Sequence, residues 1–248
     1  MGVLEGKRAV ITGGLRGIGR ATAERFRAEG GEVVIIDRDV ADEVEGVIRA
    51  DVTNADAVEL AIDRACPDGR LDICVANAGR TMLAELLDTD LDSWESIVRI
   101  NLFGTAYTFQ SAARRMVASG HGGRLLAASS VAGLRGEAGA SAYCAAKAGI
   151  VALVQSLALE LAPHDITVNA VAPGEIDTEM HSALMAEWAA AAGRSADALR
   201  REFLDSRVPA RRMGTVDEVA GVYTFLASDA AAYITGEVIR VDGGELLT

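Results

Sequence analysis

Short apolar runs alternate along the chain with longer segments in which apolar residues recur every three or four positions. The short runs are apolar at nearly every position, as in strands that are buried on both faces of a parallel sheet. The longer segments have the period of amphipathic helices, and Gly30–Gly31 marks the end of the first one. This pattern predicts seven strands, within residues 8–12, 32–37, 47–51, 71–79, 122–130, 166–174 and 237–244, and helices within 18–29, 54–65, 92–119, 143–161 and 216–228.

Strands that alternate with helices predict an α/β fold, because each crossover helix must cover a face of the sheet. We therefore expect a doubly wound Rossmann sheet that is mostly parallel and seven-stranded, with helices on both faces. The 248 residues fit a single domain, 1–248, without internal repeats. The polar, Ala-rich segment 178–207 breaks the alternation, and we expect it to form a lid over a binding site.

The composition argues against several classes of function. The formal net charge of −12 offers no basic patch for nucleic acid or for an anionic membrane surface. No apolar run approaches the roughly 20 residues of a membrane span, and the N-terminal residues enter a strand without a signal-peptide pattern. Cys66, Cys74 and Cys144 lack the paired spacing of metal ligands. We expect a cytoplasmic protein with reduced cysteines, no metal, and neither a membrane nor a nucleic-acid partner.

The candidate chemistry is concentrated near the middle of the chain. Tyr143 and Lys147 lie four residues apart, so a helix places the phenol and the ammonium on one face. A nearby cation favours the phenolate, and we expect the pKa of Tyr143 to fall and the phenol to act as a general acid and base. Ser130, upstream in AASSVAG, offers a second hydroxyl. Lys147 is one of only two lysines in the chain, and lysine, unlike arginine, has a charge whose pKa can be tuned. The structural alternative is a surface tyrosine that packs on the aliphatic part of a lysine.

A glycine-rich loop follows the first predicted strand and opens the first helix. Its sequence, TGGLRGIG, lets the backbone approach a pyrophosphate beside the free N–H groups of a helix N-terminus. Asp37 ends the second strand about 20 residues later, where a carboxylate binds the ribose hydroxyls and repels a 2′-phosphate. Arg16 and Arg38 argue the other way, since either can pair with such a phosphate. We expect NAD as the cofactor, with NADP as the less favoured alternative.

Taken together, these motifs resemble those of the short-chain dehydrogenase/reductase family in its single-domain form, nearly from end to end. TGGLRGIG is similar to the family's coenzyme loop, and ANAG to its N-N-A-G turn, with Ala76 in place of the first Asn. INLFGT supplies the family's helix asparagine, and Ser130, Tyr143 and Lys147 fit its Ser…Tyr-x-x-x-Lys spacing. APGEIDT is similar to its P-G-x-I-x-T segment, and VDGG to its C-terminal end.

The resemblance implies a role for each matching residue. Tyr143 would be the general acid and base, Lys147 would lower its pKa and bind the nicotinamide ribose, and Ser130 would polarise the substrate oxygen. Asn101 would hold a water that links Lys147 to solvent, which completes the catalytic set. The implied coenzyme-binding residues are Gly13, Leu15, Arg16, Gly17, Ile18, Gly19, Asp37, Arg38, Asp51, Val52, Asn77, Ala78, Gly79, Tyr143, Lys147, Pro173, Gly174, Ile176 and Thr178.

The resemblance further implies hydride transfer between NAD(H) and a secondary alcohol or ketone, with Tyr143 exchanging the proton. We expect a small neutral substrate, such as a polyol, a hydroxyketone or a cyclic alcohol. An NADPH-dependent biosynthetic ketoreductase and a non-catalytic dinucleotide-binding regulator are the alternatives. The residues expected at the substrate are Ser130, Glu137, Glu175, His181, Met185 and Trp188.

Two apolar faces remain to be assigned. Met180, Leu184 and Trp188 recur at four-residue spacing and would either line the substrate pocket or pack the lid onto the domain. Helices near 101–116 and 143–161 are apolar on more than one face, so we expect a neighbouring subunit to cover the side that the sheet leaves open. With the assembly common among relatives, this predicts a homotetramer of twofold symmetry. The histidines at 121, 164 and 181 are interpreted as loop or surface residues, of which the last is the one expected to touch substrate.

Overall fold

Seven parallel strands form one sheet in the order β3-β2-β1-β4-β5-β6-β7. This computed structural model describes residues 2–40 and 44–248. The strands are β1 (Arg8–Thr12), β2 (Glu32–Asp37), β3 (Val47–Arg49), β4 (Ile73–Ala76), β5 (Gly123–Ala128), β6 (Ile166–Pro173) and β7 (Val238–Val241). The α-helices are α1 (Gly17–Ala28), α2 (Ala55–Ala65), α3 (Leu91–Val98), α4 (Gly104–Ser119), α5 (Ser141–Leu161), α6 (Glu179–Ala192), α7 (Ala196–Arg207) and α8 (Val216–Ala227).

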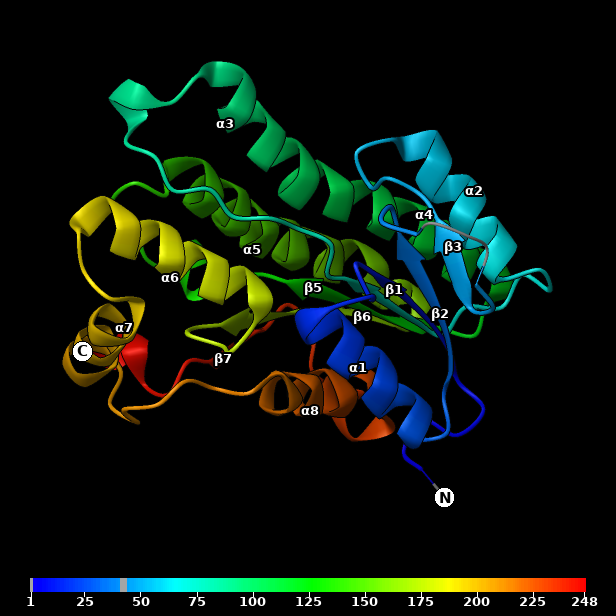
Figure 1. The fold of residues 1–248 in the computed structure, drawn as a ribbon. Helices are drawn as coiled ribbons and strands as arrows, with labels where there is room; N and C mark the ends of the chain where they lie inside the picture. The colour runs from blue at the N-terminus through cyan, green and yellow to red at the C-terminus, as the bar shows by residue number, and fades with distance from the viewer. Residues whose placement is uncertain (1, 41–43) are drawn as a thin grey trace.

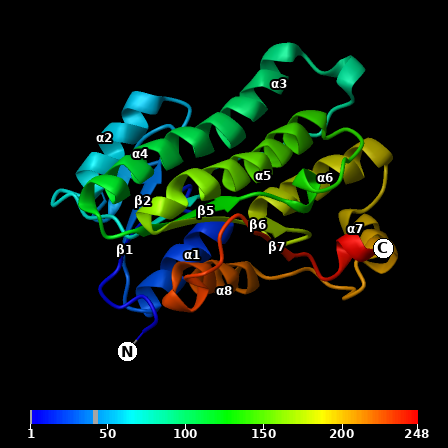
Figure 2. The same ribbon diagram turned by 180° about the vertical axis from the view of Figure 1, so that it is seen from behind.

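Helices cover both faces of this sheet. Figures 1 and 2 show α4 and α5 side by side over one face, and α1 and α8 over the other. Successive strand residues point to opposite faces, so in β1 Val10 belongs to the first core while Ala9 and Ile11 belong to the second. Burial on both faces explains why most strand positions are apolar; all eight residues of β6 are buried. The expected single-domain, doubly wound fold is confirmed.

The long helix expected at 92–119 is interrupted in the middle. A π-helical turn, Arg99–Phe103, separates α3 from α4. The side-chain amide of Asn101 donates to the carbonyl of Ile97 at 2.9 Å, which is the carbonyl that its own backbone N–H would use in an α-helix. This competition widens the turn, and such turns are frequent at functional sites.

The segment 178–207 forms two helices, α6 and α7, that lie at the end of the sheet beside the C-terminus (Figure 1). Thr178 caps α6 by accepting from the N–H of His181 at 3.1 Å, and Ser195 caps α7 in the same way. Between them, Gly193 adopts a φ of 62°, which is favourable for glycine and ends α6. The sequence pattern predicted an apolar helix face only near residues 180–188, because the rest of the segment is too polar or too rich in alanine to show periodicity.

Helix α5 is unusually apolar for its position. By length and composition, residues Ser141–His164 would qualify as a membrane span, so the expectation that no apolar run reaches this length is wrong. Only 33% of that apolar window is buried. The helix packs on β6 with its inner face, where Ile150, Val154 and Ala158 are buried, and leaves Leu159 82% exposed on its outer face.

Candidate active site

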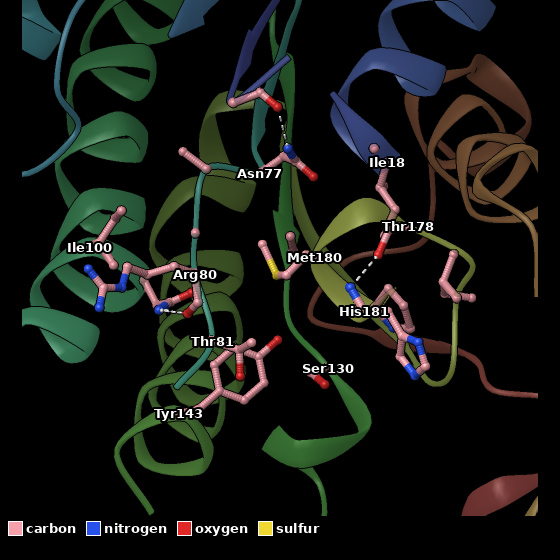
Figure 3. A pocket seen from close by; sticks show the side chains of 18 of the residues that line it. Ile18, Asn77, Arg80, Thr81, Ile100, Ser130, Tyr143, Thr178, Met180 and His181 are labelled. Atoms are coloured by element: carbon pink, nitrogen blue, oxygen red, sulfur yellow. Dashed lines mark hydrogen bonds between the residues drawn. The ribbon is translucent and has the colours of Figure 1, made fainter. Parts of the chain in front are cut away.

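A cavity of about 610 Å³ opens where the strands end in loops. Its lining includes residues that follow β1, β2, β3, β4, β5 and β6, so it lies at the carboxyl edge of the sheet. The strand order reverses between β1 and β4, and open α/β sheets bind ligands in the crevice at such a point. Figure 3 shows side chains from these loops and from α5 and α6 facing this pocket.

The glycine-rich loop after β1 is packed tightly against the turn after β4. Gly13 has a φ of 66°, and a Cβ at this position would lie 2.8 Å from the Cα of Ala78. A Cβ at Gly19 would lie 2.2 Å from the carbonyl oxygen of Gly13. The amide of Asn77 donates to that same carbonyl at 2.9 Å and ties the two loops together. The bare backbone and the N-terminus of α1 therefore form a cradle that fits a pyrophosphate.

Asp37 ends β2 at the far end of this cradle, and its carboxylate is held by the backbone. One oxygen accepts from the N–H of Asp39 at 3.1 Å, and the other accepts from the N–H of Leu15 at 3.4 Å. Arg16 and Arg38 both lie near Asp39, at 3.4 and 3.6 Å from its carboxylate. The two cations that would attract a 2′-phosphate are thus already paired with an acid.

The phenol, the ammonium and the hydroxyl predicted to act together lie at one end of the cavity. Tyr143 and Lys147 come from the first two turns of α5, and the ammonium nitrogen lies 5.5 Å from the centroid of the phenol ring. Ser130 caps a short turn after β5 and accepts from the N–H of Ala132 at 3.2 Å. Figure 3 shows the side chains of Tyr143 and Ser130 facing the same space. This arrangement places a proton donor and a second hydroxyl within reach of one bound oxygen.

The expected fall in the pKa of Tyr143 is wrong for the protein alone. Burial raises the pKa of this phenol to about 12, the hydrogen bond with Ser130 lowers it, and the negative charge of Glu137 raises it. Burial also lowers the pKa of Lys147 to about 8. The lysine is 4% exposed and donates to the carbonyl of Ala128 at 2.6 Å, so its charge is directed at a peptide dipole as well as at the phenol. The spacing of the two residues predicted their proximity and could not predict this desolvation.

Asn101 lies near Lys147, and its side-chain oxygen has no hydrogen-bond partner. Its amide nitrogen donates to the carbonyls of Ile97 and Arg80, while its buried Oδ1 has no protein partner. A Cβ on Gly79 would lie 2.5 Å from that Oδ1 and 3.7 Å from the lysine Nζ, so the absence of a side chain keeps the space between them open. Buried acceptors of this kind are normally satisfied by an ordered water.

His181 lies on the α6 side of the cavity, across from Tyr143 in Figure 3. Its Nε2 contacts a carboxylate oxygen of Glu175, and the side chains are 12% and 20% exposed. His181 is therefore a pocket residue held by an acid, and its interpretation as a loop or surface residue is wrong. The other two histidines, His121 and His164, are exposed.

The apolar stripe of α6 lines the cavity. Met180 is 46% exposed, and Leu184 and Trp188 are half-buried at the cavity wall. Among the residues of this helix whose burial is described, Met185 and Ala189 are buried. The lining also includes Glu137, whose carboxylate accepts from Arg207 of α7 at 3.4 Å. The substrate end of the cavity is thus mostly apolar, with acidic groups at its margin.

All but two of the residues expected at a site line this cavity. The two exceptions are Leu15, which contributes its backbone N–H to Asp37, and Gly19, which packs beneath the loop. Those that line the cavity are Gly13, Arg16, Gly17, Ile18, Asp37, Arg38, Asp51, Val52, Asn77, Ala78, Gly79, Asn101, Ser130, Glu137, Tyr143, Lys147, Pro173, Gly174, Glu175, Ile176, Thr178, His181, Met185 and Trp188.

Several lining residues were missed by the sequence analysis. Among them, Arg80, Thr81 and Leu83 follow β4, so the rule that parallel strands end at one edge would have found them. Another, Tyr223, comes from α8 on the opposite face and has no signal in the sequence. Within residues 2–40 and 44–248, no group of three or more His, Cys, Asp or Glu side chains is placed to hold a metal ion.

Comparisons with known proteins agree with this geometry. Residues 13–245 match the model of a family described as enoyl-(acyl carrier protein) reductase. The chain is 38% identical to a sorbitol dehydrogenase from Cereibacter sphaeroides, over 99% of both chains. It is 37% identical to a 3-oxoacyl-[acyl-carrier-protein] reductase from Aquifex aeolicus, over 97% of this chain and 98% of the other. The structure of a short-chain type dehydrogenase/reductase from Mycobacterium marinum superposes with a TM-score of 0.87, at 36% identity, over 99% of this chain and 97% of that one.

Proposed function

Because the chain belongs to the short-chain dehydrogenase/reductase family and is an oxidoreductase of alcohols and ketones, we propose that it transfers a hydride between NAD(H) and a small neutral secondary alcohol. The observation that carries this proposal is the meeting of Tyr143, Ser130 and Lys147 at one end of a cavity whose other end is the glycine cradle. The first end supplies proton transfer. The second fits the pyrophosphate and adenosine of a dinucleotide.

NAD is preferred over NADP in this proposal because of the acid at the end of β2. The carboxylate of Asp37 is held by two backbone N–H groups and faces the cavity, where it would bind ribose hydroxyls. A 2′-phosphate at the same place would meet its negative charge. When bound, the coenzyme supplies the hydride acceptor for oxidation and the hydride donor for reduction.

Tyr143 moves the proton. With a pKa raised to about 12, its phenol is protonated at neutral pH and is ready to donate to the oxygen of a ketone during reduction. Oxidation requires the phenolate, so oxidation should accelerate as the pH rises. Ser130 holds the substrate oxygen, and Lys147 stabilises the phenolate while its own charge persists. A water on the free Oδ1 of Asn101 would connect the lysine to solvent.

The substrate end of the cavity favours a neutral alcohol. The carboxylates of Glu137 and Glu175 lie at its margin and would repel an anionic substrate, while Met180, Leu184 and Trp188 provide an apolar wall. The relative named as a sorbitol dehydrogenase supports a polyol, and the apolar wall supports a hydroxyketone or a cyclic alcohol. Helices α6 and α7, which we call the lid, would close over this substrate.

A second candidate is an NADPH-dependent biosynthetic ketoreductase, which the 3-oxoacyl-[acyl-carrier-protein] reductase relative favours. Comparing turnover with NADH and NADPH, and with polyols and 3-oxoacyl thioesters, separates the two. A regulator without catalysis is disfavoured, because Ser130, Tyr143 and Lys147 are all present at the cavity.

The assembly proposed is a homotetramer. The outer faces of α4 and α5 carry partly exposed apolar side chains, among them Phe103 in the turn before α4 and Leu159 near the end of α5. A second copy of this surface is the partner that would cover them, as cyclic and dihedral symmetry allow. We also propose a cytoplasmic location, which cell fractionation tests.

The experiment that tests the proposed reaction replaces Tyr143 by Phe. Reduced nicotinamide absorbance is followed with a panel of secondary alcohols and ketones, while calorimetry measures the Kd for NADH. Turnover should fall by about 10²- to 10⁴-fold with little change in Kd, because only the proton-transferring oxygen is lost. Tyr233→Phe is the matched control, since that phenol is fully exposed on the surface. Activity in Tyr143→Phe close to that of the control would refute the assignment.

A further inference from the structure

The last residues of the chain form a tight turn against the lid. After β7, Gly243 and Gly244 both have positive φ, and the carboxylate of Asp242 accepts from the N–H groups of Gly244 and Leu246 at 3.0 and 3.1 Å. The carbonyl of Gly243 accepts from the N–H of Ala210, just beyond α7, at 3.1 Å. Figure 1 shows α7 beside the C-terminus.

This turn buries a carboxylate that neither the sequence motifs nor the proposed chemistry uses. Glu245 is 3% exposed, and one of its oxygens accepts from Arg135 at 2.9 Å. Arg135 belongs to the loop that follows Ser130 and forms one wall of the cavity. The other oxygen of Glu245 is buried and has no partner. A buried carboxylate with one partner is costly, so its retention at this position calls for a role.

The unpartnered oxygen lies against the segment that leads from β6 into the lid. A Cβ on Gly174 would lie 2.9 Å from this oxygen, so the carboxylate packs directly on the backbone of that residue. Gly174 lines the cavity, and the next residue, Glu175, holds His181 of α6. Glu245 therefore contacts two segments that both contribute residues to the cavity lining. Through Thr248, whose hydroxyl donates to the carbonyls of Glu245 and Arg207, the same turn also meets the end of α7.

We propose that Glu245 is a positioning residue, which holds the Arg135 loop, the Gly174 backbone and the end of the lid in the arrangement that binds substrate. The expected change in KM rests on the proposed function. The expected change in the position of the lid rests on the geometry alone. It assigns no contact between Glu245 and the substrate, because this side chain lies behind the cavity wall.

The charges around Glu245 make this role dependent on pH. Burial and the neighbouring negative charges raise the pKa of its carboxyl to about 7, while the two guanidinium groups act in the opposite direction. Above this pH the carboxylate is charged and its ion pair with Arg135 is intact. As the pH falls through 7 the carboxyl takes up a proton and the ion pair is lost. The charged groups that face it from the packed segments are Arg135 and Glu137 of the loop after β5, Glu175 of the loop before α6, and Arg207 of α7.

The kinetic test compares the wild-type enzyme with Glu245→Gln, which keeps the shape and removes the charge. The KM for the alcohol should rise about tenfold at pH 8, as expected for loss of a charge-assisted hydrogen bond, and the Kd for NADH should change less than twofold. In wild type the KM should rise as the pH falls from 8 to 6, and in the variant it should stay flat. An unchanged KM and an unchanged pH profile would overturn the proposal.

Two further variants control this experiment. Arg135→Gln removes the partner and should reproduce the change in KM, without further loss in the double variant, because the two residues act as one pair. It also serves if Glu245→Gln folds poorly. Glu202→Gln removes a lid carboxylate that is 64% exposed and paired with Arg194, and it should behave as wild type. Additive losses in the double variant would contradict the pairing.

A fluorescence measurement separates this proposal from the proposed reaction. The chain has two tryptophans, and Trp188 of the lid lines the cavity, so a Trp94→Phe background leaves a single reporter. Its emission should change with a midpoint near pH 7, and adding Glu245→Gln should abolish that change, whereas Glu202→Gln should not. If the enzyme turns over no alcohol, the proposed function is refuted. The fluorescence titration still tests whether the charge of Glu245 controls the conformation of the lid. A transition that persists with Glu245→Gln overturns the inference.

Discussion

Replacing Asp37 by Ala should reverse much of the preference for NAD(H). At about 4 Å, two unit charges interact by about 1 kcal/mol in water and about 4 kcal/mol near a protein surface. The carboxylate of Asp37 is half-buried at the cavity, and a 2′-phosphate carries a charge of about −1.5 to −2. A net repulsion of about 2–4 kcal/mol is therefore reasonable, which corresponds to about 30- to 700-fold in kcat/KM.

The assay measures kcat/KM with NADH and NADPH for wild type, Asp37→Ala and Asp39→Ala. Wild type should prefer NADH by about that factor. Asp37→Ala should lose affinity for NADH, because the ribose acceptor is gone, and should gain with NADPH, because Arg16 and Arg38 remain beside the site. Asp39→Ala removes the carboxylate that pairs with Arg16 and Arg38, so it should raise kcat/KM with NADPH and leave kcat/KM with NADH unchanged, because the ribose acceptor Asp37 remains. An equal loss of kcat/KM with NADH in both variants would refute an explanation based on the position of the Asp37 carboxylate.

Two further substitutions test the loop and the assembly. Gly19→Ala should weaken NADH binding at least tenfold in calorimetry, because its Cβ would lie 2.2 Å from the carbonyl oxygen of Gly13. The control Gly221→Ala has open space in α8, so it should bind NADH normally and gain about 0.5–1 kcal/mol of stability. Equal Kd values for the two variants would contradict the close packing of the loop. Leu159→Glu should reduce the mass of the assembly measured by light scattering, since a charge cannot be buried between subunits without cost. The control Leu60→Glu, on the exposed surface of α2, should leave this mass unchanged. An unchanged mass for Leu159→Glu would exclude the outer face of α5 as an interface.

The strands and the glycine loop were predictable because their causes are local. A run such as residues 166–173 is apolar at almost every position because both of its faces are buried, and that is visible in the sequence itself. The positions of Tyr143 and Lys147 followed from helical spacing in the same way. Parallel strands end at one edge, so motifs that follow different strands were expected to meet.

What could not be predicted depends on contacts between distant residues. Glu245 and Arg135 are 110 positions apart, and no local pattern indicates that they pair. The pKa of Tyr143 is set mainly by burial, which depends on the folded loops, so the local argument from its lysine neighbour predicted the wrong direction. The interruption of the long helix at Asn101 was missed, because a π-turn leaves the helical pattern of residues on either side intact.

That π-turn puts α3 and α4 out of phase with each other. An α-helix turns by about 100° per residue, so one residue accommodated in a wider turn rotates everything after it by about that angle relative to an unbroken helix. If this turn tightened into an α-helix with the same number of residues, every side chain of α4 would rotate by about that angle and face a different neighbour. Deleting one residue between Arg99 and Phe103 would instead let the two helices fuse with α4 close to its present orientation. The orientation of α4 therefore depends on the wider turn, in which the side-chain amide of Asn101 donates to the carbonyl of Ile97.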